Sequence, residues 1–269
     1  MTETSKPRHG GARSHAGTNA FTRPAVLVGF LLLILAALLL AHQVIRQAQG
    51  AEPEKPAAAK PDQKPADQGK KKDPYAWQSL FDGKTLKGWK APKFGGEGKV
   101  EVKDGQIVLN MGDTMTGITY TGKVPRTNYE IELEAMRLDG VDFFATTTFP
   151  VGEESCSLVV GGWGGTVVGL SCVDYYDASD NFTTTFHSFE DKKWYKIRIR
   201  VTSAKIEAWI DDEQVVNQER EGHKFTIRDE VDLCQPLGVS TWCTAGAIRN
   251  IRMRELSPAD IEAATEQEQ

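Results

Sequence analysis

Three consecutive segments in which polar and apolar residues alternate constrain the fold more than any other feature of the sequence. The alternation has a period of two in residues 195–201, 206–210 and 214–216. Short polar turns at 203–205 and 211–213 separate the segments. A period of two is typical of a β-strand with one buried face, and short turns between such strands favour antiparallel pairing. The segment predicts a three-stranded meander, and therefore a β protein.

Similar patterns recur along the chain. Residues 129–138 and 143–149 alternate in the same way, and residues 100–109 read as a hairpin around the turn pair Asp104-Gly105. Two more strands are expected in 237–256. Strands at near-regular intervals, glycine-rich turns and no amphipathic helix predict an all-β sandwich or jelly roll spanning residues 76–256.

The first part of the chain has a different composition. Residues 25–45 form an apolar run that is long enough for a transmembrane helix, and basic residues prevail in 1–24. The positive-inside rule then places residues 1–24 in the cytoplasm and the β domain outside the membrane. The alternative is a secretory signal cleaved near Ala48-Gln49-Gly50. Both interpretations export the domain.

Polar segments flank the predicted β domain. Residues 46–75 are rich in Pro, Ala and Lys, so we expect a disordered, extended linker. After residue 256, Ser257 followed by Pro258 is typical of a helix start. We interpret residues 257–269 as an acidic, solvated tail.

The net charge and the cysteines bear on the possible partners and on disulfide bonds. The net charge is −5, with both signs interspersed, so nothing predicts a nucleic-acid partner. An exported chain with four cysteines is compatible with disulfides. A bend at Gly164 would place Cys156 opposite Cys172, and Cys234 with Cys243 is a second possible pair. The alternative is that the cysteines are small buried thiols.

Four passages together resemble one known family. They are SLFDGKTLKGW at 79–89, YEIELEAMRL at 129–138, the long meander segment from residue 192 to 216, and LGVSTWCTAGAIRNIRMREL at 237–256. This set is similar to the 3-keto-disaccharide hydrolase domain family, whose fold is a concanavalin A-like or laminin G-like β-sandwich. The resemblance implies a carbohydrate-active domain that acts on a glycoside.

The middle of the chain departs from that family's pattern. A strand of the type Glu-x-Gln-x-x-Asp is expected, but residues 157–162 read Ser-Leu-Val-Val-Gly-Gly and contain no carboxylate. A 3-keto group acidifies the C2 proton, so elimination requires a base and a group that polarises the carbonyl. The candidate catalytic residues near the altered strands are Asp142, Asp174 and His187. We expect no cofactor and no metal, although Asp174, Asp177 and Asp180 could be calcium ligands or ordinary turn residues.

Three alternating glutamates offer another possible site. Glu130, Glu132 and Glu134 project from one face of one predicted strand. Paired carboxylates flanking a sugar bond are the usual machinery of glycosidases. The same alternation also suits a solvated outer face of a sheet.

Tryptophans next to polar residues suggest where a sugar could bind. Trp163 stands between two glycine pairs, while Trp209 and Trp242 each share a strand face with polar residues. Exposed aromatic rings beside hydrogen-bonding groups are typical of carbohydrate sites. We therefore predict that Trp163, Trp209 and Trp242, together with Asp177, contact the substrate. The alternative is that each ring covers an edge of the core.

Two principal hypotheses of function remain at this point. The first is an enzyme that acts on a glycoside, and the second is a non-catalytic glycan-binding module. An adhesion or scaffolding domain is a third. Several carboxylates and a histidine converging in one cavity would favour the enzyme. A cavity of Trp and Ser/Thr without a convergent base would favour binding.

Overall fold

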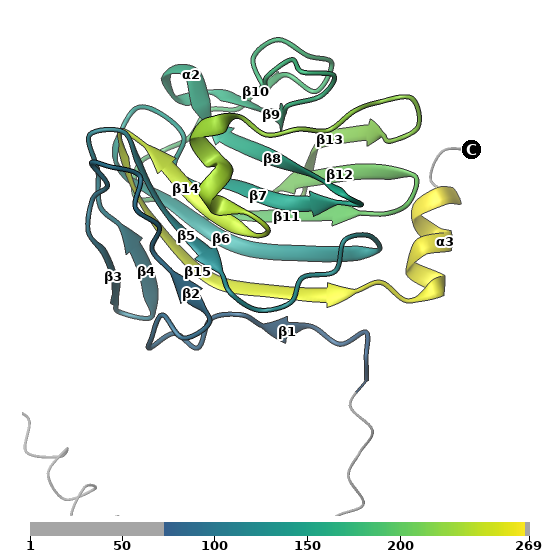
Figure 1. Cartoon of the computed structure of the whole chain (residues 1–269), viewed down its shortest axis with the longest axis horizontal. Coiled ribbons are helices and arrows are strands. Elements are labelled where there is room, and N and C mark those ends of the chain that lie inside the picture. Colours follow the sequence, from purple (N-terminus) through teal and green to yellow (C-terminus); the bar gives the residue numbers. More distant parts are fainter. Residues whose placement is uncertain (1–72, 267–269) are drawn as a thin grey trace, which may run out of the picture. The chain divides into compact units, whose positions relative to one another are not determined.

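The protein folds as two antiparallel β-sheets packed face to face (Figure 1). The computed structural model describes residues 73–266. The predicted all-β sandwich is confirmed, whereas its assignment to the concanavalin A-like jelly rolls stays a prediction. Residues 1–24 and the predicted helix at 25–45 lie outside the described part, as does most of the linker.

The first sheet contains the predicted meander. Its strand order is β13–β12–β11–β6–β15–β4–β3, and β1 pairs with β15. The predicted hairpin at 100–109 is formed by β3 and β4. The bounds of the strands are β1 (Gln78–Ser79), β3 (Val100–Lys103), β4 (Gln106–Leu109), β6 (Tyr129–Gly140), β11 (Tyr195–Val201), β12 (Lys205–Ile210), β13 (Glu213–Glu219) and β15 (Thr244–Glu255).

The second sheet has the order β10–β9–β8–β7–β14–β5–β2. Its strands are β2 (Trp89–Lys90), β5 (Met115–Tyr120), β7 (Thr146–Val151), β8 (Glu154–Gly161), β9 (Val167–Ser171), β10 (Thr185–Phe186) and β14 (Gly238–Trp242). The turn labelled α2 (Gly162–Gly165), in which Trp163 and Gly164 have non-helical backbone angles, connects β8 to β9. The 3₁₀ helix η1 (Asp229–Cys234) contacts β5 and β14.

The main core lies between the sheets because alternate residues of each strand point inward. Ile197 and Ile199 of the first sheet and Leu158, Val160 and Leu170 of the second are fully or almost fully buried in one cluster. The intervening residues face outward. On the second sheet these outward residues are also largely buried, since loops and η1 cover them.

The three alternating glutamates lie on the outer face of the first sheet, where arginines neutralise them. Arg254 contacts Glu130 at 2.7 Å, and the Nε of Arg252 donates to Glu132 at 2.8 Å. Glu134 accepts from Arg249 at 2.7 Å. All three arginines belong to β15, the strand next to the glutamates on β6. None of the three lines either of the cavities described below. The structure therefore favours the outer face of a sheet over a glycosidase pair, but this face is not solvated at Glu130 and Glu132, which are 1% and 9% exposed.

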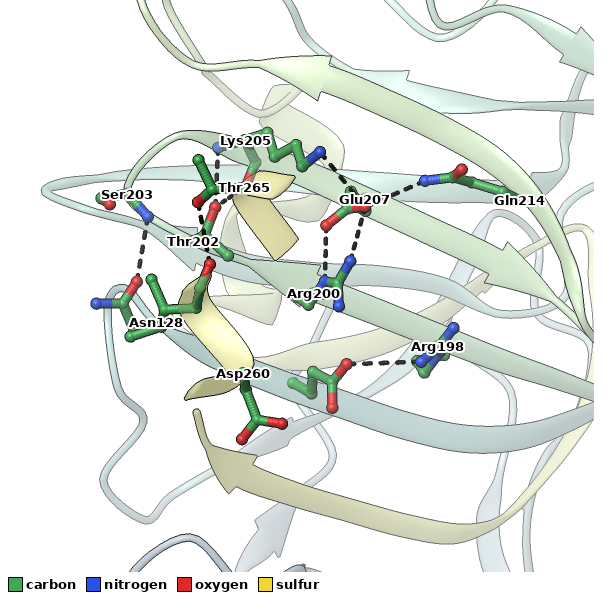
Figure 2. Close-up of polar contacts among 12 residues, drawn as sticks. Asn128, Arg198, Arg200, Thr202, Ser203, Lys205, Glu207, Gln214, Asp260 and Thr265 are labelled. Carbon is green, nitrogen blue, oxygen red and sulfur yellow. Dashed lines mark hydrogen bonds and ion pairs between the residues drawn. The ribbon is translucent and has the colours of Figure 1, made fainter. Parts of the chain in front are cut away.

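A second group of buried polar residues lies on β11 and β12 of the same sheet (Figure 2). The guanidinium of Arg200 donates two hydrogen bonds to Glu207, at 2.7 and 2.8 Å. Glu207 also accepts from Gln214 at 3.2 Å. Trp209 is only 8% exposed, and the guanidinium of Arg198 lies 3.8 Å from its ring centroid. The prediction that Trp209 is a substrate platform is therefore wrong, because arginine already occupies its free face.

The segment after the sandwich is more ordered than predicted. Helix α3 (Pro258–Glu266) begins as expected at Ser257. The Ser257 hydroxyl accepts from the backbone N–H of Asp260 at 3.2 Å, and Asp260 accepts from the N–H of Ser257 at 2.9 Å. This is a reciprocal capping box. Ala264 is buried, so the tail is not solvated throughout. Within residues 73–266 no helix is long and apolar enough to span a membrane.

The four cysteines are free thiols in the structure. Ser157 pairs with Ser171, so the register does bring Cys156 and Cys172 to neighbouring positions on the two strands. However, the predicted bridge between them is not formed, nor is one between Cys234 and Cys243. Burial raises the pKa of the Cys234 thiol to about 12, which is the behaviour of a small core residue rather than of a reactive thiol.

Candidate functional site

Hydroxyl side chains cluster on the outer face of the second sheet. Thr148 of β7 pairs with Ser157 of β8, which pairs in turn with Ser171 of β9. Thr146 lies two residues before Thr148 and shares its face. All four residues are buried. Buried hydroxyl groups normally form hydrogen bonds, so this row requires polar partners.

A cavity of about 270 Å³ opens above these hydroxyls. Thr146, Ser157 and Ser171 line it from the sheet, together with Val159. The other lining residues are aromatic or charged, or belong to η1 and the segment before it: Asp142, Phe143, Trp163, Arg228, Glu230, Val231 and Trp242. Phe143 and Trp242 are in contact, with ring centroids 6.4 Å apart. The cavity thus combines aromatic rings with a polar floor.

Trp163 reaches the cavity from an unusual backbone conformation. Its φ is +47°, and the neighbouring Gly161, Gly164 and Gly165 also have positive φ. Glycine adopts this left-handed region freely, whereas a bulky residue does so at a cost. The predicted bend around Gly164 is confirmed. Trp163 is 44% exposed, so burial does not compensate fully for the strained backbone. Strain of this kind is common at functional sites.

Asp142 lies at the same end of the cavity. One of its carboxylate oxygens accepts from the N–H of Phe143 at 2.8 Å. The backbone N–H of Asp142 donates to the hydroxyl of Thr244 at 3.0 Å, which fixes the turn. Among the described residues no cation forms an ion pair with Asp142. Its second oxygen accepts from the backbone N–H of Gly164 at 3.5 Å, so both oxygens face backbone donors while no charged partner neutralises the carboxylate.

Arg228 is held between two carboxylates. It donates to Asp177 at 3.0 Å and to Glu230 at 2.9 Å. These bonds lower the pKa of Glu230 and raise that of Arg228. Both groups stay charged at neutral pH, and Glu230 is largely neutralised by its partner. Asp177 does not line the cavity; it positions Arg228, which does.

The Thr146 hydroxyl has no hydrogen-bond partner among the described residues, although it is buried. By contrast, the hydroxyl of Thr148 is bonded to that of Ser157 at 2.9 Å. A buried hydroxyl without a partner costs free energy. Because Thr146 lines the cavity, a ligand there could supply the missing partner.

Two predicted catalytic residues lie elsewhere. Asp174 accepts from the backbone N–H of Lys224 at 2.8 Å and contacts His223 at 2.7 Å, and these bonds lower its pKa. His223 lines a second cavity, of about 330 Å³. His187 packs against Phe189, with ring centroids 4.6 Å apart, and lines neither cavity. The structure therefore separates Asp174 and His187 from Asp142, which corrects the predicted catalytic set.

Of the predicted site residues, the cavity brings together Asp142, Trp163 and Trp242. The prediction missed Arg228 and Glu230, and also the hydroxyl row. A signal for that row was present, since Thr146 and Ser157 stand at positions that alternate with core residues. No group of three or more His, Cys, Asp or Glu side chains within residues 73–266 is arranged to hold a metal ion.

Comparison with known proteins identifies the family. Residues 76–254 match the 3-keto-alpha-glucoside-1,2-lyase-like domain. The chain belongs to this family. The predicted family is thereby confirmed over nearly the whole sandwich. No curated protein sequence matches the chain.

The solved structures that the chain matches include three carbohydrate-related proteins. Domain 4 of an extracellular arabinanase from Geobacillus stearothermophilus, in complex with arabinotriose, is 16% identical, with a TM-score of 0.44 over 70% of this chain and 96% of that one. A laminarinase from Flavobacterium is 14% identical, with a TM-score of 0.44 over 68% and 100%. The carbohydrate-binding module CBM66 from Bacillus subtilis is 11% identical, with a TM-score of 0.41 over 62% and 96%.

Proposed function

We propose that this domain binds a glycoside in the cavity above the hydroxyl row. The observation that carries the proposal is the buried, unpartnered hydroxyl of Thr146 beside two tryptophans. A sugar ring offers an apolar face for an aromatic ring and hydroxyls that both donate and accept hydrogen bonds. Trp163 and Trp242 would contact the apolar face, and Thr146 would pair with a sugar hydroxyl.

The size of the cavity limits what can enter it. Ligand pockets in proteins typically measure roughly 300–1,000 Å³, so a cavity of about 270 Å³ lies at the small end of that range. One sugar ring, or one ring and part of its neighbour, would fill it. Arg228 and Asp142 would fix the orientation of the ring through hydrogen bonds to its oxygens.

The groups around the cavity favour binding over hydrolysis by paired carboxylates. Glu230 is bonded to Arg228, so it is a poor acid or base near neutral pH. Asp142 is the other carboxylate among the lining residues. Among the described residues no histidine lines this cavity. A glycosidase of the usual type needs two functional carboxylates.

Elimination from a 3-keto-glucoside is the second candidate function, and Asp142 and Arg228 in one cavity favour it. Asp142 would accept the acidic C2 proton, and Arg228 would stabilise the negative charge that develops on the 3-keto oxygen. The C1–C2 double bond then forms as the C1–O bond breaks. The departing oxygen takes a proton from solvent. Membership of the 3-keto-alpha-glucoside-1,2-lyase-like family supports this candidate.

The test uses purified full-length protein with 3-keto glucosides and their unoxidised parents, followed by calorimetry for binding and by product analysis for turnover. Binding that is weakened in Trp242→Ala supports the proposal. Turnover that Asp142→Asn abolishes without loss of affinity establishes elimination. Asp212→Asn, in an exposed turn of the other sheet, is the matched control. Absence of binding to every sugar contradicts the proposal.

We also propose that the domain lies outside the cytoplasm, attached through residues 25–45. The support is the apolar run and the basic residues that precede it. Membrane fractionation, with a terminal-sequence measurement on the recovered chain, tests this. An intact N-terminus in the membrane fraction indicates an anchor, and a chain that begins near residue 50 in the soluble fraction indicates a cleaved signal. Recovery of intact chain in the cytoplasm contradicts both.

A further inference from the structure

An exposed phenylalanine stands on the edge strand of the second sheet, on the face that carries the cavity. Phe186 of β10 is 74% exposed and pairs with Val167 of β9. Directly opposed residues of two strands project to the same side of a sheet. Val168, the next residue, belongs to the core between the sheets, so Val167 and Phe186 both face outward.

Packed side chains connect the cavity to this edge. Val167 is buried in a small cluster with Val159, Phe143 and Ala178, of which Val159 and Phe143 line the cavity. The exposed residues beside this cluster are Trp163, Gly164 and Thr166. Val167 also forms a bridge with Gly162, the residue before Trp163. Gly162, Val167 and Phe186 are therefore successive neighbours across the sheet. Two strand spacings, about 10 Å, separate the first from the last.

The position of Phe186 is unfavourable for an isolated soluble domain. An exposed apolar residue on an unpaired edge strand invites aggregation, and such edges usually carry charged residues or proline. Neighbouring structure holds the strand in place. The side chain of Asn181, in the loop before β10, donates to the carbonyl of Leu170 at 2.8 Å and accepts from the N–H of Thr183 at 2.9 Å. Phe186 is thus presented on a fixed backbone.

We propose that a glycan chain lies across the strands of the second sheet, from the cavity past Trp163 and onto Phe186. The ligand is then an oligosaccharide or polysaccharide of at least three sugar rings, of which one occupies the cavity and a later one stacks on Phe186. This inference rests on the proposed glycoside binding in the cavity. It adds a second stacking position and, with it, a preference for chain length.

Calorimetry on the full-length protein tests the chain-length preference, with maltose, maltotetraose, laminaribiose and laminaritetraose as the probes. The tetrasaccharide of the series that binds should bind more tightly than its disaccharide. Phe186→Ala should lower the affinity for the tetrasaccharide by about three- to tenfold, as expected for the loss of one aromatic contact. The disaccharide affinity should not change, because that ligand ends before Phe186.

Phe182→Ala is the matched control. Phe182 is 96% exposed in the adjacent loop, outside the strand pairing, so its loss should leave both affinities unchanged. Equal affinity for the two chain lengths, or a tetrasaccharide affinity that Phe186→Ala does not alter, overturns the proposal that a glycan chain extends to Phe186. The cavity proposal stands in either case. Binding of none of the four sugars overturns the extended glycan for these two series, whereas the cavity proposal is overturned only if the 3-keto glucosides and their parents also fail to bind.

Discussion

At the scale of single residues, Thr146 and Trp163 are each at a local disadvantage. The Thr146 hydroxyl is buried without a partner, and Trp163 has a left-handed backbone that suits glycine. Neither feature stabilises the free protein. Both residues line the same cavity, and each disadvantage would be offset by a sugar that pairs with the hydroxyl and stacks on the ring.

Thr146→Val separates stability from binding. Valine has nearly the shape of threonine and removes the unsatisfied hydroxyl, so the free energy of unfolding should stay the same or rise. Affinity for the glycoside should fall by about three- to tenfold because one hydrogen bond is lost. Thermal unfolding and calorimetry measure the two effects. Thr148→Val is the control: its hydroxyl is already bonded to Ser157, so it should lose stability instead.

Trp163→Gly should show the same separation. Glycine relieves a backbone strain of roughly 1–2 kcal/mol, so the melting temperature should not fall, while sugar binding should weaken by at least about tenfold. A clear drop in the melting temperature would instead mean that the ring covers an edge of the core. That outcome would remove Trp163 from the proposed site.

At the scale of strands and loops, the sequence predicts more of the fold than of the site. Each strand of the meander buries one face, so a period of two identifies it without knowledge of its neighbours. The cavity instead joins β7, β8 and β9 to Arg228, which is far away in the sequence. The strand order places β7, β8 and β9 side by side, and the segment before η1 brings Arg228 to the same cavity. Nearness in the sequence does not predict this arrangement, and Asp174 and His187 do not line the cavity.

Trp209 shows a second limit of sequence patterns. It shares a strand face with Glu207, and a polar face predicts exposure. In the structure, however, Arg198 and Arg200 of the neighbouring strand β11 lie over the ring of Trp209. Long arginine side chains can bury an aromatic ring while their charged ends pair with carboxylates. The periodicity of the strand does not reveal this arrangement.

The Glu207 cluster allows a prediction about stability (Figure 2). Glu207→Ala leaves the buried guanidinium of Arg200 without its carboxylate partner. The free energy of unfolding should fall by about 3–5 kcal/mol, as expected when one partner of a buried pair is removed. Denaturant unfolding measures it. Glu190→Ala breaks an exposed pair with Lys193 and should cost less than about 1 kcal/mol. Equal losses in the two variants would contradict this account.

At the scale of the whole molecule, hydrogen-bonded carboxylates determine how stability depends on pH. Hydrogen bonds from Ser257 lower the pKa of Asp260, and those from Arg228 lower the pKa of Glu230. A carboxyl with a lower pKa in the folded state stabilises the fold above its ordinary value of about 4. That contribution disappears as the pH falls through the folded-state pKa.

The melting temperature should therefore stay constant from pH 7 down to about 5 and fall below about 4. Asp260→Asn should lower the melting temperature at pH 7, because the capping box is weakened, and should make the decline in acid shallower. Calorimetric scans across this range measure both effects. An acid decline of the same steepness in the variant would show that Asp260 contributes nothing to it.

The most direct test of the account is a crystal structure of the protein with the sugar that binds most tightly. The account predicts a ring in the cavity, in contact with Trp163 or Trp242, with a sugar hydroxyl within hydrogen-bonding distance of the Thr146 Oγ1. A sugar bound elsewhere, for example in the second cavity beside His223, with the Thr146 hydroxyl still unpartnered, would contradict it.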